Sequence, residues 1–139
     1  MTPTQHILVV ANETATGEHL HHTVNAFAVD PEARVRVVAP APRSRMRRLA
    51  AEERLHSCIA RLEGLGLDVD GHLGDEDPLR AIEDALVTFP ATELVIGTHP
   101  RAQSSWLAND LVDQALARFG LPTLHTTVDV SAPRTLVAA

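Results

Sequence analysis

Lysine and tyrosine are both absent from this chain of 139 residues, and cysteine occurs once, at Cys58. Without lysine there is no P-loop lysine, no Schiff-base lysine and no Ser–Lys catalytic pair. A single cysteine forms no disulfide within the chain and no Cys-rich zinc site. Aromatic residues make up 3% of the sequence, so platforms for stacking nucleic-acid bases are poor. These absences exclude several large classes of enzyme, metalloprotein and nucleic-acid-binding protein.

Long apolar runs are also missing, because no stretch approaches the roughly 20 residues that a membrane helix requires. The opening MTPTQHILVV lacks the charged start and the small-residue cleavage site of a signal peptide. The net charge is −6 and all 12 basic residues are arginine, so a uniformly basic nucleic-acid surface is not expected. Length and composition predict a cytoplasmic protein with one domain over residues 1–130 and a tail over residues 131–139.

Strand-like and helix-like segments alternate along the chain. Short apolar runs rich in β-branched residues predict strands over 7–10, 35–38, 67–73, 94–96 and 123–130. Apolar residues at helical spacing predict helices over 17–28, 78–89 and 105–119. A further helix, with its apolar face at 55–62, is predicted to end at Gly64 and Gly66. This order predicts an α/β fold, a doubly wound five-stranded parallel sheet with helices on both faces. The expected strand order is 3-2-1-4-5.

A sheet of this kind binds ligands at the carboxyl ends of its strands, near the switch point between strands 1 and 4. Asn12 and the segment that begins at Gly97 would form the walls of this crevice. Gly97 allows a tight turn and a close approach of the backbone to a ligand. Ser104 and Ser105 precede the last helix, where hydroxyl and free N–H groups make an anion site, although Ser105 alone is equally expected as an N-cap. The predicted binding residues are Asn12, Val38, Gly97, Thr98, Ser104 and Ser105.

Two charged stretches also follow strands. The basic one contains four arginines within 43–48, which either bind phosphate or form a solvated helix entrance that pairs with Glu52 and Glu53. The acidic one, at 75–77, has the oxygen ligands of a Mg²⁺ site, but Asp77 before a proline is better explained as a helix N-cap. No metal site is therefore predicted.

Catalytic motifs are missing from the sequence, which contains no G-x-S-x-G, no H-E-x-x-H and no G-x-G-x-x-G pattern. Cys58 lies on the apolar face of its predicted helix, which indicates core packing rather than a nucleophile. His99 lies on the candidate ligand segment and is the one residue to test as an acid or base, but it has no identifiable partner. No catalytic residue is assigned, and an enzyme is the less expected outcome.

Five stretches of the sequence carry a family resemblance: HILVVANET, VRVVAPAP, GDEDPLRAIEDAL, ELVIGTH and ARFGLPTLHTTVD. Through them the chain resembles the universal stress protein family over about residues 5–130. The resemblance implies a five-stranded parallel α/β sheet and a regulatory or interaction role in stress response. It also implies a homodimer that pairs through the last strand, whose run 124–128 has few charges and therefore suits edge pairing.

Many members of that family bind ATP, with an acidic residue after strand 1 and the pattern Gly-x₂-Gly-x₉-Gly-Ser/Thr after strand 4. Here Asn12 stands in the acidic position and Gly97 matches the first glycine. Pro100, Asp110 and Leu111 replace the second glycine, the third glycine and the Ser/Thr. Pro100 offers phosphate no N–H group, and Asp110 would bring a negative charge toward it.

The resemblance therefore implies a protein that does not bind ATP in the usual way and needs no cofactor. The alternative is a module that binds ATP, another nucleotide or a small anionic ligand in the crevice between strands 1 and 4. Neither nucleic acid nor a membrane is an expected partner.

Overall fold

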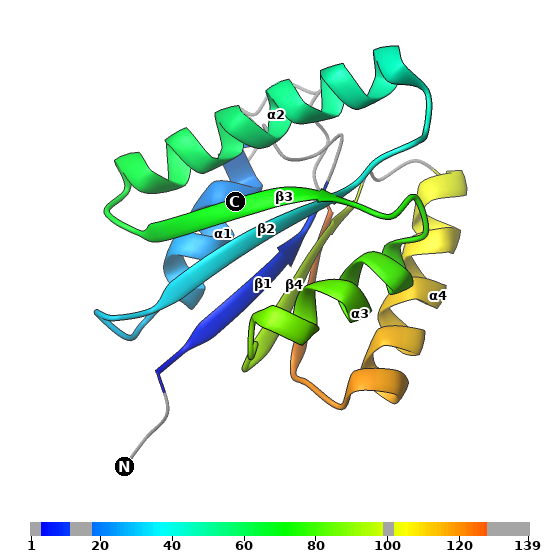
Figure 1. Ribbon diagram of the computed structural model, residues 1–139. Coiled ribbons are helices and arrows are strands. Elements are labelled where there is room, and N and C mark those ends of the chain that lie inside the picture. Colours follow the sequence, from blue (N-terminus) through cyan, green and yellow to red (C-terminus); the bar gives the residue numbers. More distant parts are fainter. Residues whose placement is uncertain (1–3, 12–17, 99–101, 128–139) are drawn as a thin grey trace.

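The computed structural model describes residues 4–11, 18–98 and 102–127, with the backbone alone for residues 18, 19, 98, 102–109 and 127 (Figure 1). Strands and helices alternate along the chain, as the sequence predicts. They are β1 (His6–Val10), α1 (Glu18–Phe27), β2 (Arg34–Pro40), α2 (Arg45–Gly64), β3 (Asp68–Gly74), α3 (Pro78–Thr88), β4 (Glu93–Thr98), α4 (Ala102–Phe119) and β5 (Thr123–Thr127).

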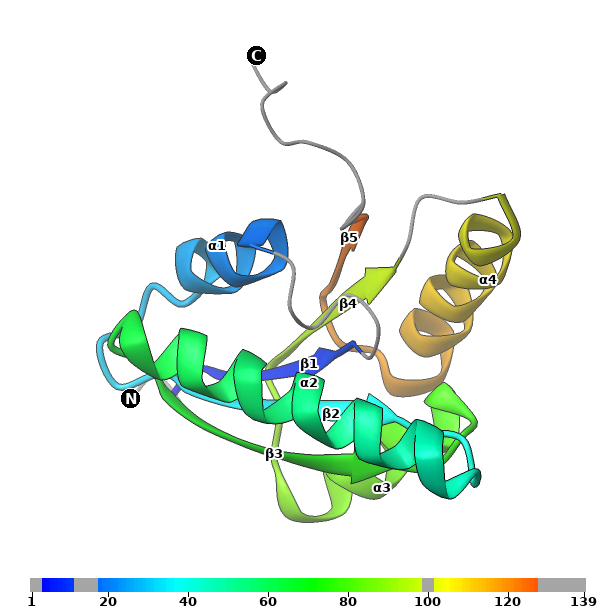
Figure 2. The same ribbon diagram turned by 90° about the horizontal axis from the view of Figure 1, so that it is seen from above.

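The sheet is parallel throughout and has the order β3-β2-β1-β4-β5, which confirms the predicted topology. The central strand β1 pairs with β2 on one side and β4 on the other, so that Leu8 lies opposite both Arg36 and Leu94. Figure 2 shows β4 and β5 between α1 and α4, while α2 runs along β3. Helices therefore cover both faces of the sheet.

Alternate residues of β1 fill two separate apolar cores. Ile7 and Val9 pack in the core formed with α1 and α2, whereas Leu8 and Val10 pack in the core formed with α3 and α4. All four side chains are buried, as expected for a parallel strand covered on both faces. Cys58 belongs to the first core, which confirms its predicted packing role.

Local sequence signals explain where α3 begins and where α2 ends. The Asp77 carboxylate accepts a hydrogen bond from the Leu79 N–H at 3.1 Å, and Pro78 takes the first helical position of α3. Helix α2 ends at Gly64, and Gly66 then adopts a φ of +92°, which glycine reaches without steric cost. Both boundaries were predicted.

The start of α4 differs from its prediction. The helix begins at Ala102, so Ser104 and Ser105 lie inside its first turns and Ser105 is not the N-cap. Alanine and glutamine at the first two positions favour helix and outweigh the loop-like composition of the preceding residues. The expected boundary between domain and tail lies outside the described residues. Among the described helices, none is long and apolar enough to cross a membrane.

Gln5 ties together the chain segments at the amino end of the sheet. Its Nε2 donates to the Phe27 carbonyl oxygen and to the Glu93 carboxylate, both at 2.8 Å. Its Oε1 accepts hydrogen bonds from the N–H groups of Val29 at 3.0 Å and Asp30 at 3.2 Å. One amide side chain thus joins the starts of β1 and β4 to the loop before β2.

A second bonded group lies nearby, around Arg36 of β2. Its guanidinium donates to both carboxylate oxygens of Asp70, at 2.9 and 3.0 Å, and to the Thr88 hydroxyl at 3.0 Å. It also lies 4.9 Å from the centroid of the Phe89 ring, whose edge-to-face partner is His6. This bidentate pair links β2, β3 and the end of α3.

Candidate functional site

The site begins with the topological switch point at the carboxyl end of the sheet. Strands β1 and β4 are neighbours, yet the chain leaves β1 toward α1 on one face and leaves β4 toward α4 on the other. Loops that diverge in this way leave room above the strand ends, and ligands of doubly wound sheets bind there. The strand arrangement on which the predicted site between strands 1 and 4 depends is therefore present in the sheet.

Three of the predicted binding residues lie at this edge in the described part of the strands. Gly97 is half-buried near the end of β4, where it pairs with Thr126 of β5, and Thr98 is the last residue of that strand. Val38 is fully buried in the core beneath α3 and α4, and its carbonyl accepts the Ala11 N–H at 3.2 Å. Any contribution of Val38 to a ligand is consequently one of backbone and not of side chain.

The start of α4 supplies the second element of the site. Helix α4 begins four residues after β4 ends, so its first turn follows the strand end closely. The first N–H groups of an α-helix have no acceptor within the helix and attract anions. The backbone of Ser104 lies in this first turn, and Ser105 follows it. Asn12 and His99 lie outside the described residues.

The helical course of α4 bears directly on the degenerate glycine motif. Residues 102–109 belong to the nine-residue spacer of that motif, and in this chain they are helical. Within a helix most N–H groups already donate to carbonyl oxygens four residues earlier. Asp110 is exposed farther along α4, where its carboxylate accepts a hydrogen bond from the Gln114 amide. This segment thus has neither the glycines nor the free backbone of a loop around a triphosphate.

The arginines at 43–48 surround the start of α2, at the same end of the molecule as the carboxyl ends of β2 and β3 (Figure 1). A hydrogen bond of 3.3 Å from the Ala41 N–H to the Gly74 carbonyl joins this segment to the end of β3. All four arginine side chains are exposed, which fits the solvated entrance that the sequence offered as one interpretation. Within the described residues no ion pair joins them to Glu52 or Glu53, however.

The acidic stretch after β3 serves the local backbone. Asp75 accepts a hydrogen bond from the Asp77 N–H at 2.9 Å, and Asp77 caps α3 as described above. Among the residues described by the structure, no three His, Cys, Asp or Glu side chains are placed to hold a metal ion.

Cys58 is a free cysteine buried in the first core. Burial in the core raises the pKa of its thiol to about 12, so the nucleophilic thiolate is scarce at neutral pH. The bonded groups around Gln5 and Arg36 are the polar features that the sequence did not predict. Their partners are up to 88 residues apart in the chain, and no local pattern connects them.

Among the comparisons with known proteins, the one with solved structures identifies the fold. No family model matches the sequence, and no curated protein matches it either. The structure is similar to a universal stress protein from Archaeoglobus fulgidus, with 20% identity, 88% of this chain and 93% of that chain covered, and a TM-score of 0.66. It is also similar to an Arabidopsis thaliana protein of the universal stress protein family with AMP bound, with 10% identity, 93% and 94% covered, and a TM-score of 0.64.

A third solved structure is a universal stress protein in complex with cAMP. It shares 15% identity over 91% of this chain and 100% of that chain, with a TM-score of 0.63. The chain therefore has the universal stress protein fold, and the resemblance of the sequence in fold is confirmed.

Proposed function

We propose that this chain is a regulatory or interaction protein of the stress response that binds an adenine mononucleotide at the carboxyl edge between β1 and β4. The observation that carries this proposal is the pairing of Gly97, near the end of β4, with a helix that starts four residues after that strand. A small residue and a helix N-terminus at a switch point suit a ligand with one phosphate. The AMP and cAMP complexes of proteins with this fold support the same ligand class.

A mononucleotide suits this edge better than ATP does. A triphosphate needs an extended run of free N–H groups, whereas residues 102–109 are helical here and Asp110 adds a carboxylate farther along α4. A single phosphate needs the first turn of α4 alone. The protein would thus bind nucleotide without binding ATP in the way the family motif implies.

Each predicted residue then has a definite task. The N–H groups at the start of α4, with Ser104 and Ser105, would hold the phosphate. Gly97 and Thr98 would let the nucleotide approach the end of β4, and Val38 would contribute through its backbone. Asn12 carries a neutral amide, which donates as well as accepts hydrogen bonds.

The test is a calorimetric titration of the purified protein with AMP, with cAMP and with Mg-ATP. We expect AMP or cAMP to bind and the Gly97→Val protein to lose at least about tenfold in affinity, since the added side chain blocks a close backbone approach. Gly64→Val is the matched control, because a Cβ at Gly64 meets no atom within 4 Å. Unchanged binding by the Gly97→Val protein, or tight binding of Mg-ATP alone, would contradict the proposal.

We further propose that the protein forms a homodimer through β5, because the two edges of the sheet differ in protection. The edge strand β3 carries exposed charges at Asp68 and Asp70, which discourage pairing with another chain. The edge strand β5 carries no charged residue over Thr123–Thr127, and Leu124 is exposed on it.

Sedimentation velocity of the wild type and of a Leu124→Glu variant tests the dimer. We expect the wild type to sediment as a dimer at micromolar concentration and the variant to shift toward monomer. Val87→Glu, which also puts a charge on an exposed apolar residue, is the control and should remain dimeric. A monomeric wild type would refute the dimer and leave the nucleotide site unaffected.

A further inference from the structure

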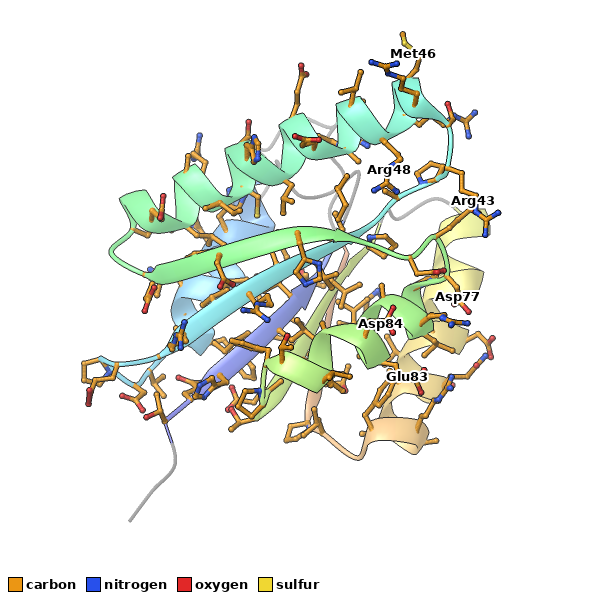
Figure 3. The ribbon with its side chains drawn as sticks, in the orientation of Figure 1. Arg43, Met46, Arg48, Asp77, Glu83 and Asp84 are labelled. Carbon is orange, nitrogen blue, oxygen red and sulfur yellow. The ribbon has the colours of Figure 1, made fainter. Side chains whose placement is uncertain are left out.

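Exposed cationic and apolar side chains surround the start of α2, and we call this surface the α2 patch. Met46 and Leu49 lie one helical turn apart and are 78% and 51% exposed. Figure 3 shows Met46 on the outer side of the first turn of the helix, with Arg43 and Arg48 on the side nearer the sheet. The complete patch consists of Arg43, Arg45, Met46, Arg47, Arg48 and Leu49, all of them exposed.

The positive charge of the α2 patch is not neutralised by the described part of the chain. None of its guanidinium groups takes part in a hydrogen bond or ion pair with a described residue. The N-cap residue Ser44 makes no side-chain capping bond, and the first turn of α2 contains no acidic residue. The helix dipole adds further positive potential at this end. Arginines at an uncapped helix start lower the stability of the helix, and such a local cost is expected where the residues bind a ligand or partner.

The α2 patch also has the opposite sign to the rest of the protein. Four of the 12 arginines belong to it, so the remaining 12 − 4 = 8 arginines face 18 acidic residues. The patch thus carries +4 and the rest of the chain carries 8 − 18 = −10. A partner that binds here must be anionic where it meets the patch.

We propose that the α2 patch binds an acidic segment of a partner protein in which carboxylates flank an apolar side chain. Arginine binds carboxylates through two parallel hydrogen bonds, and arginine and methionine are both enriched at protein–protein interfaces. Met46 and Leu49 supply an apolar contact that an anion alone would not use. This interaction goes beyond the proposed nucleotide site and does not depend on it.

The surroundings of the patch disfavour an extended polyanion such as a membrane surface or a nucleic-acid duplex. The Ala41–Gly74 hydrogen bond brings the basic segment beside the exposed acidic residues at 75–77. Figure 3 places Asp77 on the same side of the molecule as Arg43. A long or planar polyanion would meet these carboxylates and the remaining net charge of the chain, whereas a short acidic segment would meet the patch alone.

The probe is a fluorescent synthetic peptide of glutamate and leucine, with the leucines at positions i, i+3 and i+7. Its binding is measured by fluorescence anisotropy at about 50 mM NaCl, where exposed charges are only moderately screened. We expect the wild type to bind it and the Arg45→Glu/Arg48→Glu protein to bind at least about tenfold more weakly. Arg80→Glu is the matched control, since Arg80 is also exposed in the first turn of a helix, and it should bind within about twofold of wild type.

The apolar half of the patch is tested separately. Met46→Ser/Leu49→Ser should weaken the glutamate–leucine peptide severalfold and leave a glutamate–serine peptide unaffected. Circular dichroism of each variant shows whether α2 is intact. A negative charge near the start of a helix interacts favourably with the helix dipole, so Arg45→Glu/Arg48→Glu should not unfold α2. Loss of peptide binding with α2 intact would therefore show that the side chains of the patch contact the peptide.

Several outcomes would overturn the inference. They are failure of the wild type to bind the peptide, equal weakening by Arg80→Glu, and tighter binding of phosphatidylserine vesicles or duplex DNA than of the peptide. A loss of AMP affinity in the Arg45→Glu/Arg48→Glu protein would instead assign the patch to the nucleotide site. Loss of peptide binding with unchanged AMP affinity separates the two surfaces and supports the proposal.

Discussion

Side chains at the amino end of the sheet are bonded to one another, whereas the arginines at the carboxyl end have no partner among the described residues. At the amino end Gln5 makes four hydrogen bonds, and Arg36 bonds Asp70 and Thr88. At the carboxyl end α2 begins with arginines and without a capping bond. Bonded side chains tie the segments of the amino end together, while the arginines at the carboxyl end make no such bonds, so the two ends should respond differently to substitution.

Gln5→Ala should cause the largest loss of stability at the amino end. The substitution removes all four side-chain hydrogen bonds of Gln5, although the Val29 N–H still donates to the Phe27 carbonyl at 3.0 Å. We expect the free energy of unfolding to fall by about 2–3 kcal/mol, because unsatisfied polar groups in partly buried sites are costly. Urea unfolding measures this value, with the exposed Gln114→Ala of α4 as the control. A change below about 0.5 kcal/mol would show that the Gln5 bonds are dispensable.

Gly74→Ala tests whether the carboxyl end is loosely built. A Cβ at this position would lie 2.8 Å from the Cβ of Ala81 and 2.9 Å from Cγ2 of Val38, so the packing between β2, β3 and α3 must shift. We expect a destabilisation of about 1–3 kcal/mol in urea unfolding, as for other overpacked cores. Gly64→Ala has open space and should be neutral or slightly stabilising. Equal behaviour of the two variants would mean that this end is loosely packed as well.

The Arg36–Asp70 pair should make part of the stability depend on pH. Hydrogen bonds from the guanidinium lower the pKa of Asp70 below its ordinary value. A carboxyl whose pKa is depressed by folding stabilises the protein fully above its unfolded pKa of about 4, and this contribution is lost as the pH falls through the folded pKa. Asp70 is 51% exposed, so the contribution at neutral pH should be no more than about 1 kcal/mol.

Asp70→Asn removes this contribution, and thermal unfolding from neutral pH to about pH 2 measures it. The variant should melt below the wild type at neutral pH, and the gap should close in acid. If the difference in melting temperature stays constant across this pH range, the charge of Asp70 does not account for the stabilisation. Asp68→Asn is the control, because its ion pair with Arg34 is longer, at 3.6 Å, and more exposed.

The sequence predicted those parts of the fold that depend on local pattern. The strands, their order and the Asp77 cap follow from periodicity, crossover handedness and a favourable residue at a helix start. The start of α4 was misplaced by three residues, because loop-like residues before Ser105 conceal two good helix formers. The bonds of Gln5 and Arg36 were beyond prediction, since they join residues that only the tertiary fold brings together.

For the candidate site, the sequence predicts a place in the fold, and the surroundings of its residues required the structure. The switch-point rule predicts a site between β1 and β4, which are neighbours in the sheet, and Gly97 lies near the end of β4. Burial of the Val38 side chain is expected in an interior strand covered on both faces, but its place in the core with α3 and α4 required the structure, because the sequence does not say which face of β2 meets α3. The exposed arginines of α2 were visible in the sequence, but their lack of ion pairs with Glu52 and Glu53 required the structure.

The smallest effect we expect is a gain, and it concerns the carboxyl end. Arg45 is the first residue of α2, where a cation opposes the helix dipole and no acidic residue compensates. Arg45→Glu should therefore raise the free energy of unfolding by about 0.3–1 kcal/mol at low salt. The gain should largely vanish at about 1 M NaCl, where the Debye length is about 3 Å. Ser57→Glu, an exposed change in the middle of the same helix, should show no such gain.

If Arg45→Glu instead destabilises the protein, Arg45 has a structural partner and the two ends of the sheet are more alike than their bonding indicates. If the variant is more stable and binds the glutamate–leucine peptide more weakly, the arginine lowers the stability of the fold and contributes to binding. That combination would support a binding role for the α2 patch. Four arginines lie around this one helix start, where positive charge opposes the helix dipole, and binding would explain why the sequence keeps them there.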